Sequence, residues 1–174
     1  LKEITVIPNL VDDEFFKPVD HSIRNQEFTF FSLGRMVPQK GIDILLKAFA
    51  SMHSKAQLRI GGDGPHLNEY RRLARDLKID HKIIWLDQLD KNQALKEYQN
   101  CDAFVLPSRH ESMGVVFAEA MACGKPSIAT ICGGPEEFID DSVGYLASPE
   151  DVAGLQESME KMLSNFSLFD PGLI

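Results

Sequence analysis

Phe28–Leu33 reads FTFFSL, Gly34–Gly41 reads GRMVPQKG, and Ile42–Met52 reads IDILLKAFASM. The first run is short, mostly apolar and rich in aromatic residues, which is typical of a buried strand. In the third run the apolar residues recur three or four positions apart, so they share one face of a helix. This stretch therefore predicts a strand, a loop and an amphipathic helix.

The same alternation continues along the chain. Further strand-like runs are Ile4–Ile7, Ala56–Ile60, Lys82–Leu86, Ala103–Leu106, Pro126–Ile131 and Val143–Leu146. Helical patterns run from Leu67 to Leu77, from Val116 to Cys123 and from Val152 to Met162. Nearly continuous apolar strands that alternate with amphipathic helices indicate parallel βαβ units. We therefore predict an α/β fold: a doubly wound parallel sheet with helices on both faces.

Size and composition exclude several classes of protein. With 174 residues, 44% of them hydrophobic, the chain can bury the core of one domain without metals or disulfides. Its 18 basic and 26 acidic residues include no dense Lys/Arg block, which argues against nucleic-acid binding. Cys101, Cys123 and Cys132 form no C-x-x-C pair, so we expect a reducing, cytoplasmic setting without structural zinc. No apolar run reaches the roughly 18 to 20 residues of a membrane span.

The first loop that can carry chemistry is Gly34–Gly41. Ligands of doubly wound sheets bind outside the carboxyl ends of the strands, where loops lead into helices. This loop places Arg35 and Lys40 beside a helix start, whose free N–H groups and dipole favour an anion. The two cations suit two linked phosphates; solvated surface positions are the alternative. Neither G-x-x-x-x-G-K-[ST] nor G-x-G-x-x-G is present, which argues against a P-loop NTPase and an ordinary dehydrogenase.

The second loop is Pro107–Gly114, which precedes a predicted helix. Its last glycine allows close approach of the backbone to a ligand, and the first N–H groups of the helix are unpaired. Glu111 in the loop and Glu119 on the helix can enter one cleft at different depths, where sugar or ribose hydroxyls would satisfy both carboxylates. The alternatives are a plain loop acid and a solvated helix glutamate. A helix that is apolar nearly all round, as this one is, argues against the second.

Taken in order, these motifs resemble a known family. The sequence is similar to the nucleotide-sugar-binding half of a retaining glycosyltransferase of the GT-B fold, in the large glycosyl transferase group 1, or family 4. The resemblance runs from Ile7 to about Leu163 and departs from the family pattern at Leu10 and Asp87, where the family often has Gly. The motifs that carry it are Ile7-Pro8-Asn9, Gly34-Arg35 with Lys40-Gly41, Gly62-Asp63-Gly64-Pro65, Pro107-Ser108, and Glu111 with Glu119.

The resemblance implies how a donor is bound. Arg35, Lys40 and the first amides of the helix would stabilise the diphosphate as it leaves the anomeric carbon, while the acceptor hydroxyl arrives on the same face. Glu111 would hold hydroxyls of the transferred sugar, and Glu119 those of the ribose. The resemblance implies no metal, because Arg35 and Lys40 stand where another family would place Asp ligands and a divalent ion. It implies no cofactor, because the UDP or GDP sugar is a substrate. The implied catalytic residues are Arg35, Lys40 and Glu111, and the implied substrate-binding residues are Gly34, Arg35, Lys40, Leu89, Glu111, Ser112, Met113, Gly114, Val115, Val116 and Glu119.

The resemblance also implies that residues 1–174 are the C-terminal, Rossmann-like domain of a two-domain hexosyltransferase of polysaccharide or glycolipid synthesis. The sequence lacks an initiating Met. We therefore expect a fragment that binds donor and is inactive without its N-terminal, acceptor-binding domain. Any peripheral contact of the full-length protein with the inner face of a membrane would be made by that missing half. We expect the tail, about residues 165–174, to be frayed, with Phe166, Leu168 and Phe169 lacking a burial partner.

Two rival functions share the predicted fold. A GT-B sugar-nucleotide epimerase is disfavoured by the spaced pair of Glu111 and Glu119. A non-catalytic nucleotide-binding α/β module has no reason to keep two cations and two acids around one cleft.

Overall fold

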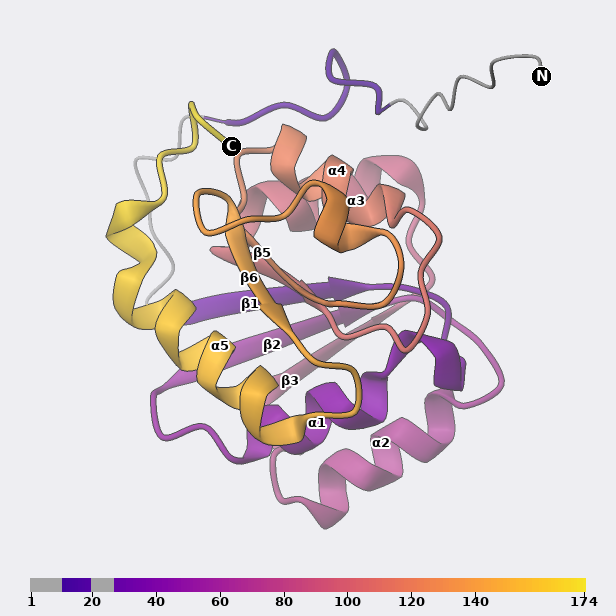
Figure 1. The fold of residues 1–174 in the computed structure, drawn as a ribbon. Helices are drawn as coiled ribbons and strands as arrows, with labels where there is room; N and C mark the ends of the chain where they lie inside the picture. Colours follow the sequence, from indigo (N-terminus) through magenta and orange to yellow (C-terminus); the bar gives the residue numbers. More distant parts are fainter. Residues whose placement is uncertain (1–10, 20–26) are drawn as a thin grey trace, which may run out of the picture.

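The protein is described by a computed structural model that covers residues 11–19 and 27–174. Its centre is a parallel sheet of six strands in the order β3-β2-β1-β4-β5-β6 (Figure 1). The strands are β1 (Phe28–Leu33), β2 (Ala56–Gly61), β3 (Ile83–Asp87), β4 (Ala103–Leu106), β5 (Ser127–Thr130) and β6 (Gly144–Ala147). These confirm the six strands predicted after residue 27, each end to within one residue. The predicted strand Ile4–Ile7 lies outside the described residues.

The chain builds this sheet outward from its centre in two directions. On one side β1 pairs with β2, where Phe30 lies opposite Leu58, and β2 pairs with β3. On the other side β1 pairs with β4, where Phe30 lies opposite Ala103, and β5 and β6 follow. The loops after β1 and β4 therefore leave the same edge of the sheet as neighbours. Ligands of doubly wound sheets bind at this reversal of strand order.

Helices cover both faces of the sheet, which confirms the doubly wound fold. Figure 1 shows α1, α2 and α5 on one face and α3 and α4 on the other. The helices are α1 (Ile42–Ala50), α2 (Leu67–Asp76), α3 (Lys91–Asn100), α4 (Val115–Ala122) and α5 (Val152–Asn165). Short 3-10 turns are η1 (Pro38–Lys40), η2 (Asp80–Lys82), η3 (Pro135–Glu137) and η4 (Phe166–Leu168).

The helix α3 was not predicted from the apolar pattern. Only Ala94 and Tyr98 of its residues are buried, so the sequence shows little helical periodicity there. The start of α3 is instead marked by a capping box, in which the Asp90 side chain accepts from the Gln93 N–H and the Gln93 side chain accepts from the Asp90 N–H. This exchange satisfies two backbone donors at the helix start.

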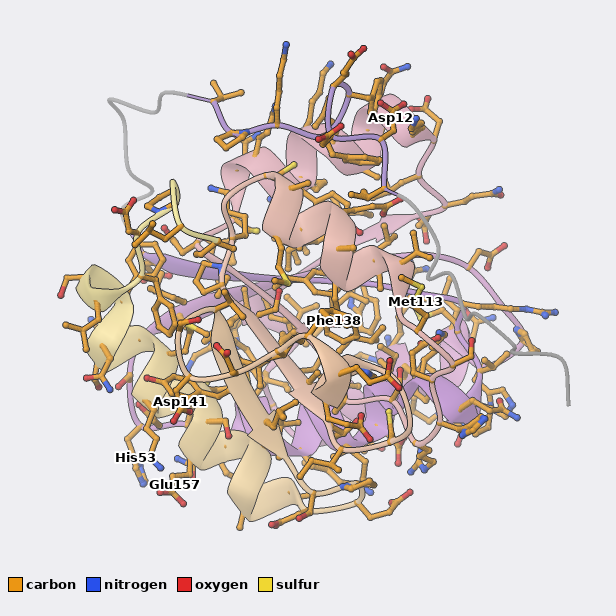
Figure 2. The ribbon with its side chains drawn as sticks, turned by 45° about the horizontal axis from the view of Figure 1, so that its top comes forward. Asp12, His53, Met113, Phe138, Asp141 and Glu157 are labelled. Carbon is orange, nitrogen blue, oxygen red and sulfur yellow. The ribbon has the colours of Figure 1, made fainter. Side chains whose placement is uncertain are left out.

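Aromatic rings fill the core between the sheet and α3. Tyr98 is fully buried, with its ring centroid 5.2 Å from that of Phe31 and 5.5 Å from that of Phe104. The segment 11–19 adds Phe16, 5.9 Å from Tyr98. Asp12, labelled in Figure 2, pairs with Lys91 at 3.0 Å and so ties this segment to the start of α3. Residues 11–19 are therefore an integral layer over α3.

The end of the chain differs from the expectation for two of its apolar residues. Phe166 stacks edge-on against Phe28 at 5.2 Å, and Phe169 is only 8% exposed and lies 5.7 Å from Tyr145. The prediction that both lack a burial partner is wrong, because the chain turns back through η4 and the two rings pack against Phe28 of β1 and Tyr145 of β6. Leu168, at 77% exposed, does lack one. No helix in residues 11–19 or 27–174 is long and apolar enough to cross a membrane.

Candidate functional site

The loops after β1 and β4 lie in direct backbone contact. Gly41 has a φ of +67°, and a Cβ at this position would overlap the carbonyl oxygen of Pro107. The Arg109 N–H donates to the Gln39 carbonyl at 2.8 Å. A positive φ and this close approach both require glycine at position 41. The loop that carries Arg35 and Lys40 is therefore held against the loop that carries Glu111.

The loop after β2 completes this edge of the sheet. A Cβ on Gly62, which has a φ of +121°, would overlap the carbonyl oxygen of Gly34. The Met36 N–H donates to the Asp63 carbonyl at 2.9 Å. The Gly62–Gly64 motif thus fits a structural purpose: it lets two loops pack without side chains between them.

Lys40 and Glu111 meet as an ion pair between the Lys40 Nζ and the Glu111 Oε2. Their side chains are 24% and 13% exposed. The Ser108 hydroxyl donates to the same carboxylate oxygen at 3.4 Å. The structure therefore brings together a predicted cation and a predicted acid that are 71 positions apart in the chain. Arg35 is exposed, and its side chain forms no hydrogen bond or ion pair with any residue in the described part of the chain.

The start of α4 lies directly after Glu111. Gly114 is its N-cap residue, with a φ of +75° and no side chain to cap the helix. The N–H of Phe117 bonds the carbonyl of Gly114, whereas within the described residues the N–H groups of Val115 and Val116 have no protein acceptor. Unpaired N–H groups and the helix dipole make such a start attractive to an anion.

Glu119 lies one turn further along α4 and is half-buried. Its Oε2 accepts a hydrogen bond of 2.9 Å from the Tyr98 hydroxyl on α3. Burial raises the pKa of the Glu119 carboxyl, while the Tyr98 hydrogen bond and the charge of Lys91 act in the opposite direction. The alternative of a solvated helix glutamate is therefore wrong for Glu119.

The other predicted contact residues line the same edge. Ser112 is exposed, and Met113, labelled in Figure 2, is half-buried against Gly134, where a Cβ would come within 2.8 Å of the Met113 Cα. Leu89, in the loop after β3, packs over Gly61, where a Cβ would lie 2.7 Å from the Leu89 Cδ1. Their parts in ligand binding remain predictions.

Arg109, in the loop after β4, holds three segments together. Its guanidinium bonds Asp43 of α1 at 2.8 and 2.9 Å, the Pro38 carbonyl of η1, and Glu150 before α5. The hydrogen bonds that Arg109 donates to Asp43 and then to Glu150 raise the pKa of Arg109 above its ordinary value. No local signal marks this contact in the sequence, because its acceptors lie 41 to 71 positions away.

A cavity of about 400 Å³ lies beside this edge, between η1, α1 and α2. Asp43 and Arg109 line it, but Lys40, Glu111 and Glu119 do not. The predicted site is thus a surface made by loops rather than this cavity. Among residues 11–19 and 27–174, no group of three His, Cys, Asp or Glu side chains is arranged to hold a metal ion.

The family assignment follows from a match along most of the chain. The sequence model of the family described as "Glycosyl transferases group 1" matches residues 13–168. The chain belongs to this family. The match includes the loops after β1 and β4 and the whole of α4.

Relatives of this group 1 glycosyl transferase chain include a GDP-mannose-dependent monoacylated α-(1-6)-phosphatidylinositol monomannoside mannosyltransferase of Corynebacterium glutamicum. It is 30% identical over 91% of this chain, which spans only 46% of the relative's length. HepE of Anabaena, solved with UDP and glucose, has a TM-score of 0.86 at 23% identity, over 95% of this chain and 48% of that one. The C-terminal domain of a Francisella tularensis group 1 glycosyl transferase has a TM-score of 0.80 at 24% identity, over 91% and 90%. The α/β sheet is therefore the Rossmann-like fold of these glycosyltransferase structures.

One departure of this group 1 chain from the family pattern has a structural explanation. Asp87, at the end of β3, has a φ of +53°, a conformation that glycine adopts most easily. Aspartate tolerates this region better than most residues, and its carbonyl accepts from the Gly62 N–H at 2.7 Å. The loop after β3 therefore keeps the backbone turn that a glycine would give.

Proposed function

We propose that this chain is the donor-binding, C-terminal domain of a retaining GT-B glycosyltransferase that uses a nucleoside-diphosphate sugar. The observation that supports this most is the meeting of Lys40 and Glu111 next to the unpaired amides at the start of α4. An ammonium group and two N–H donors suit a diphosphate, and the neighbouring carboxylate suits sugar hydroxyls. A donor whose phosphates contact Lys40 would present its sugar to Glu111.

In this proposal the protein stabilises charge on the leaving group. The bond between the anomeric carbon and the diphosphate oxygen breaks, and negative charge grows on the diphosphate. The acceptor oxygen bonds to the same face of that carbon, and its hydroxyl proton passes to the departing diphosphate. We propose that Arg35, Lys40 and the amides of Val115 and Val116 stabilise that charge, because such stabilisation is commonly the largest contribution to catalysis. These groups supply the positive charge, so the proposed reaction is independent of a metal ion. Glu111 orients the transferred sugar and does not act as a nucleophile.

The comparisons support a nucleotide-sugar donor. The Corynebacterium relative is named as GDP-mannose-dependent, and HepE was solved with UDP and glucose. The chemistry common to both is a nucleoside diphosphate together with a hexose. We therefore propose a UDP or GDP hexose as donor and polysaccharide or glycolipid synthesis as the setting.

We further propose that a second domain supplies the acceptor site. The chain spans 46% of the Corynebacterium relative, whereas it covers 90% of the Francisella structure, which is itself a C-terminal domain. GT-B enzymes act between two such domains. The isolated chain should therefore bind donor and transfer no sugar.

A thermal-shift screen with UDP, GDP, ADP and their hexose derivatives tests donor binding. A ligand at about 100 times its Kd stabilises the folded chain by about 2.7 kcal/mol. We expect one nucleotide family to raise the melting temperature of the wild type and to raise that of Lys40→Ala much less. Lys161→Ala, which removes an exposed cation on α5, is the matched control and should respond as the wild type does. The proposal fails if no nucleotide stabilises the chain, or if Lys40→Ala responds fully.

A transfer assay separates a glycosyltransferase from the two rival functions. The full-length protein and this chain are incubated with labelled donor and candidate acceptors. We expect transfer by the full-length protein alone. Interconversion of the sugar nucleotide would indicate an epimerase, and tight nucleotide binding without any turnover by the full-length protein would indicate a non-catalytic module.

A further inference from the structure

The hydroxyl of Tyr98 is a buried polar group that the proposed function does not yet use. Tyr98 lies on α3, is fully buried, and donates its hydroxyl hydrogen to Glu119 Oε2 on α4 at 2.9 Å. Through this hydrogen bond, Tyr98 of α3 holds the carboxylate of Glu119 on α4.

The position of this hydroxyl is fixed by the packing of its ring. The rings of Phe31, Phe104 and Phe16 surround it, with centroids 5.2, 5.5 and 5.9 Å away. Two of these rings belong to β1 and β4, and the third belongs to the segment 11–19. A phenol held on several sides cannot follow a moving carboxylate, so the carboxylate is held where the phenol is.

The protonation states of Tyr98 and Glu119 decide which of them donates the hydrogen bond. Burial, followed by the charge of Glu119, raises the pKa of Tyr98 well above its ordinary value. The phenol therefore keeps its proton at neutral pH and acts as donor, and the carboxylate accepts. Within the described residues, Glu119 Oε1 accepts no hydrogen bond, so one carboxylate oxygen stays available for a ligand hydroxyl.

We propose that Tyr98 is a positioning residue for nucleotide recognition: it fixes the Glu119 carboxylate so that its free oxygen accepts from the ribose hydroxyls of the donor. This inference rests on the proposed function, because it requires Glu119 to face the ribose. It adds that the discrimination between ribose and deoxyribose depends on a residue of α3 that does not touch the ligand.

The pH dependence of binding gives a readout that a purely structural contact would not move. The titratable and charged groups near Glu119 are Tyr98 and Lys91 on α3 and Cys123 on α4, and Lys91 is in turn paired with Asp12. The Tyr98 hydrogen bond lowers the pKa of Glu119 against the effect of burial. Removal of the phenol oxygen should therefore raise the pKa of Glu119 further. As the pH is lowered, nucleotide affinity should then begin to fall at a higher pH than in the wild type.

The experiment measures the affinity of the chain for UDP and GDP, and for their 2′-deoxy and 3′-deoxy forms, by calorimetry between pH 5 and 8. In Tyr98→Phe we expect the preference for the ribonucleotide to fall by about three- to tenfold, the scale of one hydrogen bond, with little change in affinity for the deoxynucleotide. The pH midpoint, the pH at which half of the ribonucleotide affinity is lost, should be higher than in the wild type. Tyr145→Phe is the matched control: it removes a hydroxyl that accepts from Asn165, away from Glu119, and should change neither quantity.

Two further variants keep the proposal open to refutation. Glu119→Gln tests the ribose assignment itself: if the wild type does not prefer the ribonucleotide and Glu119→Gln changes nothing, that part of the proposed function is wrong. If Glu119→Gln abolishes the preference but Tyr98→Phe keeps both the preference and the pH midpoint, the proposed function stands and the positioning by Tyr98 is refuted. Should Tyr98→Phe unfold, 3-fluorotyrosine at position 98, a stronger donor of the same size, must shift the midpoint downward; an unchanged midpoint refutes the inference.

Discussion

At the scale of single residues, the candidate site carries two cations and a carboxylate on the neighbouring loops after β1 and β4. Lys40 and Glu111 neutralise each other in a partly buried contact, while Arg35 extends into solvent without a protein partner in the described ranges. In the proposed function both cations bind the diphosphate. Each charged residue is also separable by mutation, since none of them packs in the core.

Removal of either cation should weaken binding of the diphosphate. We predict that Lys40→Ala and Arg35→Ala each reduce the affinity for UDP or GDP by about 1.5 to 3 kcal/mol, the range for hydrogen bonds to charged groups. Calorimetric titration measures the loss, and circular dichroism checks that the fold is intact. Unchanged affinity in both variants would show that the phosphates do not bind at this edge of the sheet.

The two acids should divide the donor between them. We predict that Glu119→Ala reduces affinity for the bare nucleotide, because the proposed function assigns Glu119 to the ribose. Glu111→Ala should mainly reduce the preference for the sugar nucleotide over the bare nucleotide, because the proposed function assigns Glu111 to the transferred sugar. Titration of each variant with nucleotide and sugar nucleotide checks this, and equal losses for the bare nucleotide would show that the assignment of the two acids is wrong.

At the scale of elements, Arg109 links the loop after β4 to α1 and to the segment before α5. Burial raises the pKa of Asp43, but the Arg109 hydrogen bond and charge outweigh it, so the pKa lies below 3.8 in the folded chain. A carboxyl whose pKa is lowered by folding stabilises the fold above its unfolded pKa and loses this contribution as the pH falls through the folded value. We predict that Arg109→Ala lowers the free energy of unfolding by about 1 to 3 kcal/mol at pH 7.

The pH dependence of that loss is the sharper test. The difference between wild type and Arg109→Ala in urea unfolding should be largest near neutral pH and should shrink below about pH 4, as Asp43 takes up a proton. A difference that is constant from pH 7 to pH 3 would show that the Asp43 pair does not carry the effect.

The end of α2 offers a test of backbone conformation. Lys78 has a φ of +60°, and the bonds from Ile79 N to Ala74 O (3.0 Å) and from Lys78 N to Arg75 O (2.9 Å) form a Schellman motif. Glycine adopts this conformation without the clash of a Cβ, so we predict that Lys78→Gly stabilises the fold by about 0.5 to 1 kcal/mol. Lys78→Ala removes the charge but keeps the Cβ and serves as control. Equal stability of the two variants in urea unfolding would contradict the prediction.

The sequence allowed most elements to be predicted, for a physical reason. Strands such as β1 and β4 are buried on both faces, so their apolar runs are continuous and easily recognised. The helix α3 escaped this reasoning because its outer face is polar, although Asp90 and Gln93 mark its start. The placement of Lys40 and Glu111 around one cleft followed from the rule that loops meet at one sheet edge, but their ion pair was not predicted. The contacts of Arg109 and Tyr98 depend on side-chain packing between distant elements and leave no local pattern.

At the scale of the whole molecule, the sheet has two halves that diverge from β1 and β4. Every predicted contact residue lies in a loop at the carboxyl edge of the strands or in the first two turns of α4. The cavity between α1 and α2 lies beside this edge and shares none of the predicted residues. We therefore propose that a nucleoside diphosphate binds across the loops after β1 and β4 and the start of α4.

Amide chemical shifts test this place most directly. The chain is labelled with ¹⁵N and titrated with UDP and with GDP, and each backbone amide is followed by NMR. We predict that the largest shifts occur in residues 34–41 and 111–116, with saturation at one nucleotide per chain, and that Lys40→Ala weakens them. Shifts confined to residues around the cavity between α1 and α2, or no saturable shift with either nucleotide, would contradict the account.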